Sequence, residues 1–151
     1  MKISIATDHG GFELKNHLLK VISSSGYEVL DKGAHTFDPN DDYPDFAKLV
    51  AKSIQKGETT KGIIICGSGV GASITATKFK GVRAAICHDT YSAAQGVEHD
   101  DMNVLCLGAR VIKVNVAVKI VQNFLEAQFD PDTRFVRRLN KVMEIEKSQL
   151  G

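Results

Sequence analysis

The stretch GIIICGSGVGAS, residues 62–73, decides the fold. Its first half, Gly62–Cys66, is an apolar run, and its second half carries three alternating glycines, Gly67, Gly69 and Gly71. A short run that is apolar throughout is typical of a strand that helices cover on both faces. Glycines allow the chain to turn tightly from such a strand into a helix. The stretch therefore predicts a strand–turn–helix unit of an α/β protein with a parallel sheet.

The same alternation of short apolar runs and longer amphipathic segments extends over most of the chain. It predicts strands at 3–7, 27–30, 62–66, 82–87 and 103–107. Apolar residues at helical spacing predict helices at about 14–22, 44–54, 72–80, 90–97 and 114–125. An additional C-terminal helix is predicted at about 133–148, after the Asp130-Pro131-Asp132 turn.

Length and composition restrict the class of protein. A chain of 151 residues that is 43% hydrophobic fits a single domain. Its 19 basic and 18 acidic residues give a net charge of +1, which excludes a general attraction to nucleic acid or to an anionic membrane. Three cysteines without a CxxC pair, no signal-peptide pattern and no apolar stretch of ~18 residues predict a cytoplasmic protein.

Polar and reactive residues follow the predicted strands at their carboxyl ends, where ligands bind in open parallel sheets. They are Asp8 and His9 after the first strand, Cys66 and the glycines after the third, His88 and Asp89 after the fourth, and Arg110 after the fifth. The irregular segment 32–43, which contains Asp41 and Asp42, adds a long polar loop of a kind that often carries function.

The glycine turn predicts a site for an anion, because free main-chain N–H groups at the start of a helix attract negative charge. The anion is either a bound phosphate or an oxyanion that forms during a reaction. Cys66, directly before the turn, is either a base or nucleophile favoured as a thiolate by the helix end, or a packed thiol like Cys87 and Cys106. A dinucleotide site with Asp89 as the ribose-binding acid is a weaker alternative, since the pattern is GxGxG and not GxGxxG.

Two further groups of residues are candidates for binding sites, one for an anion and one for a metal ion. Arg134 and Arg138 lie four residues apart, so that both guanidinium groups share one helix face and can bind a dianion together. An alternative hydrolase metal site would gather histidines and carboxylates from several strand ends, with a spacing that matches no tight metal motif. Its members would be Asp8, His9, His88, Asp89, His99 and Asp100.

Taken together, the motifs resemble those of the type B ribose-5-phosphate isomerases, a group that also contains the galactose-6-phosphate isomerase subunits. The resemblance covers nearly the whole chain. It rests on Asp8-His9-Gly10-Gly11, Asp42-Tyr43-Pro44, Ile65-Cys66-Gly67-Ser68-Gly69-Val70-Gly71, His99 with Asn103-Val104-Leu105, Gly108-Ala109-Arg110-Val111, and Arg134 with Arg138.

The resemblance implies a single-domain, Rossmann-like three-layer α/β/α sandwich with a five-stranded parallel sheet. It implies isomerisation of an open-chain phosphopentose, in the non-oxidative branch of the pentose phosphate pathway, without a cofactor or metal. The catalytic residues that it implies are Cys66 as the base, His99 for ring opening, Ser68 beside the enediolate and Asp8 along the sugar. The substrate-binding residues that it implies are His9, Tyr43, Gly67, Gly69, Val70, Gly71, Asp100, Arg110, Arg134 and Arg138. It also implies a homodimer in which His99 and the C-terminal arginines reach the partner's site, with a dimer of dimers as a further option.

One residue departs from the family pattern. Position 100 commonly carries Asn in the family, and here it is Asp100, whose carboxylate would bind a sugar phosphate less well. The choice between a phosphopentose and a phosphohexose, such as galactose 6-phosphate or allose 6-phosphate, stays open. So does a sugar-phosphate- or nucleotide-binding module without catalysis. Because one chain keeps both Cys66 and His99, a self-sufficient enzyme is favoured over a subunit that divides these residues with another chain.

Overall fold

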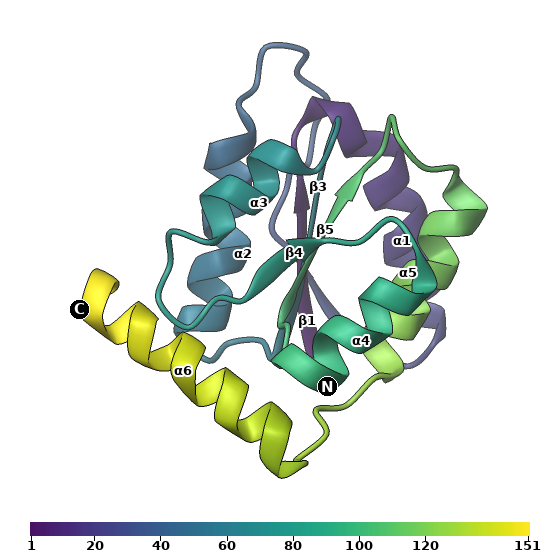
Figure 1. Cartoon of the computed structure of the whole chain (residues 1–151). Helices are drawn as coiled ribbons and strands as arrows, with labels where there is room; N and C mark the ends of the chain where they lie inside the picture. Colours follow the sequence, from purple (N-terminus) through teal and green to yellow (C-terminus); the bar gives the residue numbers. More distant parts are fainter.

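The computed structural model describes residues 1–151 and shows a five-stranded parallel sheet between two layers of helices (Figure 1). The strands are β1 (Lys2–Thr7), β2 (Glu28–Asp31), β3 (Lys61–Cys66), β4 (Ala84–Ile86) and β5 (Val104–Gly108). The helices are the 3-10 turn η1 (His9–Gly11), α1 (Phe12–Ser24), α2 (Tyr43–Gln55), α3 (Val70–Ala76), α4 (Thr90–Asp100), α5 (Val114–Glu126) and α6 (Thr133–Leu150). The predicted α/β/α architecture is confirmed.

The strand order β2-β1-β3-β5-β4 determines which helices share a face. The steps from β1 to β2 and from β4 to β5 go toward the β2 edge of the sheet. The steps from β2 to β3 and from β3 to β4 go toward the β4 edge. Right-handed crossovers then place α1 and α4 on one face and α2 and α3 on the other. The two buried clusters match this division, with α5 beside α1 and α4 (Figure 1).

The strand order reverses between β1 and β3, and such a switch point is where ligands bind in open α/β sheets. The central strand β3 is buried along its whole length, and it pairs with β1 on one side and with β5 on the other. Residues that follow β1, β3 and β5 therefore meet at one edge of the sheet, the upper edge in Figure 1.

A buried lysine fixes the loop that joins β2 to α2. Lys15 of α1 is 1% exposed, and its ammonium lies 2.8 Å and 3.0 Å from the two carboxylate oxygens of Asp31 at the end of β2. It also donates to the carbonyl of Ala34 at 2.6 Å. A buried ammonium needs such partners, so the start of the loop is held against α1.

Two elements are shorter than predicted. The strand expected at 82–87 is only β4, because it is an edge strand whose residues pair with β5 alone, from Ala84 opposite Val104 to Ile86 opposite Cys106. The helix expected up to Lys80 ends at Ala76, and the exposed residues after it form turns that lead to Gly81, where φ is +81°.

α6 packs against the rest of the chain over little of its surface. It lies along the lower edge in Figure 1, below the sheet and beyond α4. Only Phe135 is buried among its residues, whereas Val142, Met143 and Ile145 are 52%, 49% and 64% exposed. None of the helices is both long and apolar enough to cross a membrane.

Candidate active site

The switch point brings Asp8 and Cys66 to neighbouring positions. Thr7 of β1 pairs with Ile65 of β3, so that the next residue of each strand stands at the same edge of the sheet. Both side chains are nearly buried, with Asp8 7% and Cys66 4% exposed. A carboxyl group and a thiol thus lie beside the start of the glycine turn, as the sequence predicts.

Cys66 differs from the other two cysteines in its surroundings. The main-chain N–H of Gly69 donates to its Sγ at 3.0 Å, and such a bond stabilises negative charge on sulfur. Burial without a comparable donor raises the pKa of Cys87 to about 11 and also raises the pKa of Cys106. The structure therefore supports the interpretation of Cys87 and Cys106 as core residues, and the bond from Gly69 distinguishes Cys66 from both.

The turn after Cys66 presents unpaired main-chain donors. The N–H groups of Gly67, Ser68 and Gly71 have no acceptor within the chain, while that of Val70 bonds the Ser68 hydroxyl oxygen at 3.2 Å. Gly69 has a φ of +82°, and a Cβ there would lie 3.1 Å from the backbone of Leu107, so only glycine fits. Unpaired N–H groups beside a thiol form a site in which an oxyanion can accept hydrogen bonds.

Side chains from two other segments close over this turn. The ring of Tyr43, at the start of α2, covers Gly71, where an added Cβ would lie 2.6 Å from the ring. The guanidinium of Arg110, after β5, covers Gly67, where an added Cβ would lie 3.0 Å from Nη1. The main-chain N–H of Arg110 also donates to the Gly67 carbonyl at 3.0 Å. The phenol and the guanidinium thus flank the unpaired donors from opposite sides of the turn.

Asp8 and His9 connect the site to the loop between β2 and α2. Asp8 caps η1 by accepting the Gly10 N–H at 2.9 Å, and burial is the main cause that raises its pKa. The Nδ1 atom of His9 lies 2.7 Å from Oδ1 of Asp41, and this hydrogen bond is the main cause that raises the pKa of His9.

The ligand atoms of Asp8, His9 and Asp41 lie within 4.8 Å of one another, close enough for a metal ion to be considered. However, the His9 nitrogen and the Asp41 oxygen are bonded to each other, and an Asp8 oxygen is used by the cap of η1. The ion pair and the cap account for the closeness of the three side chains.

His99 lies at the opposite edge of the sheet from Cys66. α4 starts after β4 at the carboxyl edge and runs back for 11 residues, so its last turn lies near the start of β5. Cys66 pairs with Gly108, the last residue of β5. The length of β5, five residues at ~3.3 Å each or roughly 15 Å, therefore separates the two ends within one chain.

The structure does bring His99 and the arginines of α6 together. The His99 ring stacks on Phe135 with a centroid distance of 3.9 Å, and Nδ1 lies 3.0 Å from the amide nitrogen of Gln95. The Arg134 guanidinium lies 4.6 Å from the centroid of the same Phe135 ring. One aromatic ring thus places the histidine and the first arginine in a common cluster.

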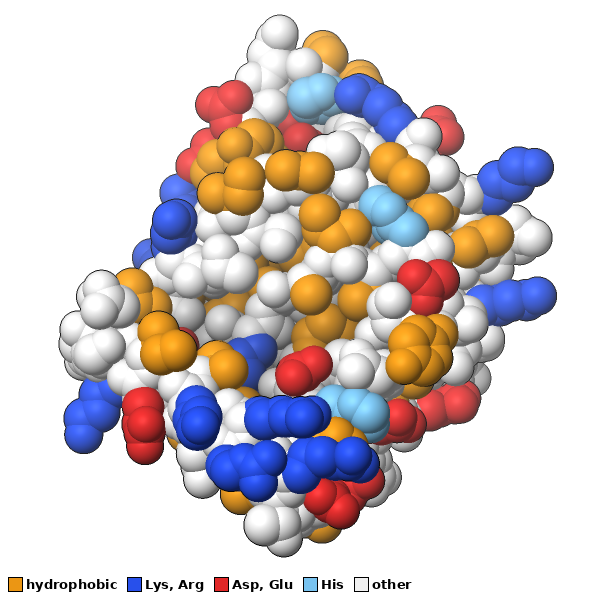
Figure 2. Space-filling model, viewed as in Figure 1, with side chains coloured by type: hydrophobic (Ala, Val, Ile, Leu, Met, Phe, Trp, Pro, Cys, Tyr) orange, Lys and Arg blue, Asp and Glu red, His pale blue; other side chains and the backbone are white.

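Basic side chains gather over α6 at the lower end of the molecule, as Figure 2 shows. Arg134, Arg137, Arg138 and Lys141 are all exposed on this helix. Arg134 is only weakly paired, with Nε 3.9 Å from Asp132 Oδ1, and Arg138 forms no ion pair in the chain. The two arginines therefore have donors free for an anionic ligand.

The metal site and the dinucleotide site considered from the sequence are both wrong. His99 and Asp100 end α4 at the other edge of the sheet, so the six proposed ligands do not assemble. The Nε2 atom of His88 already accepts the Gly108 N–H at 3.1 Å. Asp89 acts as the N-cap of α4, with its carboxylate accepting the Ser92 N–H at 2.6 Å and the Ser92 hydroxyl at 2.9 Å. Asp100 is exposed and forms no ion pair, since Arg83 binds Asp101 instead at 2.7 Å.

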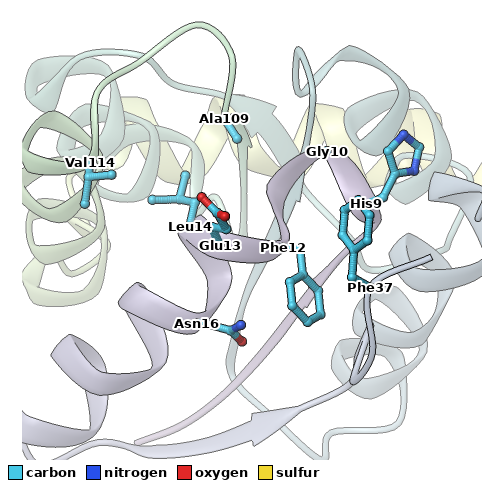
Figure 3. A pocket seen from close by; sticks show the side chains of 9 residues that line it. All are labelled: His9, Gly10, Phe12, Glu13, Leu14, Asn16, Phe37, Ala109 and Val114. Carbon is cyan, nitrogen blue, oxygen red and sulfur yellow. The ribbon is translucent and has the colours of Figure 1, made fainter. Parts of the chain in front are cut away.

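A cavity of about 570 Å³ opens beside His9 and Gly10 at the carboxyl edge (Figure 3). Its wall is largely apolar, and it does not include Cys66. It is lined by His9, Gly10, Phe12, Glu13, Leu14, Asn16, Phe37, Ala109 and Val114. Phe12 and Phe37 meet edge to face, with centroids 5.9 Å apart. The cavity therefore adjoins the site with Cys66 and meets it at His9 and Gly10.

Sequence reasoning missed the contributions of Asp41 and Phe135. The loop that holds Asp41 was marked by its length and polarity, but no local pattern predicts a bond to a histidine 32 residues away. Phe135 lies within the predicted C-terminal helix, but no local pattern marks it as a partner of His99, because the stacking depends on how α4 and α6 pack.

Comparison with known proteins places this arrangement in a family. Residues 3–142 match the family described as Ribose/Galactose Isomerase. The chain is 41% identical to "Ribose-5-phosphate isomerase B" of Escherichia coli, covering 97% of each chain. It is 42% identical to "Probable ribose-5-phosphate isomerase B" of Mycoplasma pneumoniae, covering 97% of this chain and 96% of the relative.

A solved structure supports the same relationship. The chain is similar to ribose-5-phosphate isomerase B from Mycoplasma genitalium with bound ribulose-5-phosphate, with a TM-score of 0.93 and 42% identity. The match covers 98% of this chain and 97% of that structure. Because the relatives match in sequence and in fold over nearly their whole length, the chain belongs to the ribose/galactose isomerase family of enzymes.

Proposed function

We propose that this chain is a cytoplasmic, homodimeric isomerase that interconverts ribose 5-phosphate and ribulose 5-phosphate, with Cys66 as the base. The observation that carries the proposal is a thiol that accepts one main-chain N–H and stands beside three unpaired ones. The similarity to relatives named for this activity over nearly their full length supports the choice of substrate.

In this mechanism the Cys66 thiolate removes the proton from C2 of the open-chain aldose. The electrons of the C2–H bond form the C1–C2 double bond of an enediolate, and the carbonyl oxygen at C1 takes up negative charge. The C2 hydroxyl gives its proton to the C1 oxygen, so that the negative charge moves to the oxygen on C2. As that oxygen forms the C2 carbonyl, the electrons of the C1–C2 double bond take the proton back from the Cys66 thiol at C1. A single base that serves both carbons accounts for the proton transfer, and positioned acid–base groups contribute about 10²- to 10⁴-fold in rate.

The turn supplies the stabilisation that the enediolate needs. The unpaired N–H groups of Gly67, Ser68 and Gly71 can donate to the charged oxygen, and the exposed Ser68 hydroxyl adds a fourth donor. Gly69 and Val70, which lie between Ser68 and Gly71, stabilise the conformation of the turn. Asp8 and Tyr43, which border the turn, are placed to bind the sugar hydroxyls. These donors are fixed before the charge develops, which is the condition for effective oxyanion stabilisation.

Phosphate binding and ring opening fall to residues from both edges of the sheet. His9 and Arg110 stand at the carboxyl edge, while His99, Arg134 and Arg138 stand near the amino edge of the same chain. A substrate that contacts Cys66 cannot reach this second group across roughly 15 Å of the same sheet. In the proposed homodimer, the second group comes from the partner chain, with Asp100 near the sugar.

Exposed apolar side chains at both edges support such a dimer. Phe37, Val111 and Val114 are 59%, 58% and 46% exposed around the carboxyl edge. On α6, Val142, Met143 and Ile145 are similarly exposed. Because large exposed apolar patches mark protein interfaces, these two surfaces are the candidates for contact between subunits.

Turnover of a panel of sugar phosphates, measured with a chelator present, tests the proposed function. We expect the highest kcat/KM with ribose 5-phosphate and no loss of rate on adding EDTA. The panel includes allose 6-phosphate and galactose 6-phosphate. A higher kcat/KM with either hexose phosphate would contradict the assigned substrate. Complete absence of turnover would contradict the proposal that the protein is a sugar-phosphate isomerase.

Truncation of the α6 arginines should weaken substrate binding. Loss of a hydrogen bond to a charged group costs about 1.5–3 kcal/mol, so Arg134→Ala and Arg138→Ala should each raise KM for ribose 5-phosphate roughly 10- to 100-fold. The kcat should fall much less, because the phosphate is remote from the reacting carbons. Lys147→Ala, on the opposite side of the same helix, is the control. Steady-state kinetics that give an unchanged KM for both variants would rule out these phosphate contacts.

Replacement of His99 should impair one direction of the reaction more than the other. If His99 opens the furanose ring, His99→Asn should reduce the rate with cyclic ribose 5-phosphate at least ~100-fold, the contribution of a positioned acid–base group. Ribulose 5-phosphate is acyclic, and its aldose product can close its ring in solution after release. The measurement is the initial rate in each direction. Gln95→Glu is the control variant, because it keeps His99 and a hydrogen-bond partner for its Nδ1. Equal losses in both directions would contradict the role in ring opening.

A further inference from the structure

His9 is held by a carboxylate from a distant part of the chain. Oδ1 of Asp41 accepts the His9 main-chain N–H at 2.9 Å and lies 2.7 Å from Nδ1 of the ring. Both bonds end on the same oxygen, so the backbone and the ring of His9 are fixed together. The other ring nitrogen, Nε2, has no hydrogen-bond partner in the chain, and the His9 side chain is 30% exposed. It is therefore the nitrogen that a ligand can reach.

Asp41 is buried in a way that calls for a compensating charge. Its side chain is only 9% exposed, and Oδ2 is buried without any hydrogen-bond partner. A buried carboxylate is costly unless it is paired and hydrogen-bonded. The His9 ring is the only cation that it contacts, so the arrangement is most stable when that ring carries a positive charge.

The other charged groups around His9 do not cancel this effect. Asp8 faces it from the end of β1, Asp41 from the loop between β2 and α2, and Arg110 from the segment after β5. The two carboxylates favour the protonated ring, whereas burial and the guanidinium oppose it. On balance the pKa of His9 is raised above its usual value, with the bond to Asp41 as the largest cause.

The charge on the ring decides whether His9 can bind a phosphate. With Nδ1–H donated to Asp41, a neutral ring would present the lone pair of Nε2 to the phosphate oxygens, which are themselves acceptors. Only the imidazolium presents an N–H at Nε2, and hydrogen bonds between charged groups are about twice as strong as neutral ones.

We propose that Asp41 is a positioning residue of the substrate site, which holds His9 in the orientation and charge state that donates Nε2–H to the substrate phosphate. This inference rests on the proposed function, in which His9 contacts that phosphate. It adds a residue that acts through His9 and does not touch the substrate itself.

The test is the KM of Asp41→Asn as a function of pH. At pH 8 we expect KM for ribose 5-phosphate to rise roughly tenfold, as for loss of a hydrogen bond to a charged group, with kcat within about twofold. In the wild-type enzyme KM should rise as pH increases through the raised pKa of His9. In the variant that pKa returns toward its usual ~6.5, so KM should begin to rise at lower pH. Near pH 5.5 both rings are protonated and the ratio of the two KM values should approach one.

Asp38→Asn is the matched control, because Asp38 lies in the same loop, loses the same charge and also accepts a main-chain N–H, that of Asn40 at 2.9 Å. Its KM should not change. In a His9→Gln background the effect of Asp41→Asn should disappear. A KM ratio that is the same at pH 5.5 and pH 8 would assign Asp41 a merely structural role and overturn the proposal.

A measurement on the wild-type protein keeps the proposal testable if the variant does not fold. The His9 ring resonances, followed by NMR against pH, should titrate above the usual histidine pKa, and titration at or below it would overturn the proposal. The proposed function fails in a different way. If Asp41→Asn leaves KM unchanged while Arg134→Ala raises it, only the role of Asp41 is lost. If the wild-type enzyme turns over no sugar phosphate, the proposed function itself is lost.

Discussion

Cys66→Ala should reduce kcat for ribose 5-phosphate by about 10³-fold, which corresponds to roughly 4 kcal/mol in the activation free energy. The substitution removes the proposed base for the proton at C2 and leaves no functional group at that position. It also leaves the Gly69 N–H without its acceptor, although this small loss affects stability more than rate. KM should change little, because the phosphate and sugar contacts remain. Steady-state kinetics in both directions measure the effect.

The other cysteines provide the control. Cys87 is as buried as Cys66, and burial raises its pKa to about 11, so that it is a neutral packing thiol near pH 8. Cys87→Ala should lower the thermal stability and leave kcat near the wild-type value. Alkylation by iodoacetamide should follow the same division, with inactivation in proportion to modification of Cys66. Near-normal turnover by a folded Cys66→Ala enzyme would remove the thiol from the mechanism.

The fold could be predicted largely from local patterns. The apolar run that ends at Cys66 and the glycines after it span only a few residues. They determine the strand, the turn and the start of the helix whatever position this unit takes in the sheet. What the pattern did not reveal was the neighbour of each strand. β4 reads as a six-residue strand, but it lies at the edge of the sheet and keeps only three residues in the ladder.

The candidate site depends more heavily on packing between distant segments. Tyr43 lies on Gly71 because α2 and α3 pack together on one face of the sheet. Asp41 meets His9 because the β2–α2 loop returns across the carboxyl edge. Phe135 meets His99 because α6 packs on the end of α4. None of these contacts has a fixed spacing in the sequence, so only the residue types could be anticipated.

The division of the site between two edges has a structural cause. A crossover helix that follows a parallel strand runs antiparallel to it, so a residue at the end of α4 must lie at the amino edge when Cys66 lies at the carboxyl edge. Under the proposed function, the chain therefore carries the groups that the reaction needs at opposite edges of the sheet. In the proposed dimer, each site combines groups from one edge of each chain.

A heterodimer of two chains that are each impaired in turnover of ribose 5-phosphate should recover activity with that substrate. We expect a dimer of one Cys66→Ala chain and one His99→Asn chain, co-expressed with two different tags and purified through both, to show about half the activity of the wild-type dimer. In a two-fold symmetric dimer with shared sites, one site combines Cys66 of one chain with His99 of the other, and is intact. The second site carries both substitutions and is inactive. Each variant homodimer, by contrast, has the same defect in both sites.

The matched control pairs two substitutions from the same edge. Asp8 and Cys66 stand beside each other in one chain, so an Asp8→Asn chain combined with a Cys66→Ala chain leaves one defect in each site. That heterodimer should show no more than the mean activity of its two parent homodimers, although it has the same number of wild-type residues. If the first heterodimer also remained inactive while its tags proved that both chains were present, each chain would have to build its site alone. Recovery in the first pair and not in the second depends only on which edge each residue occupies, and so it tests the shared site directly.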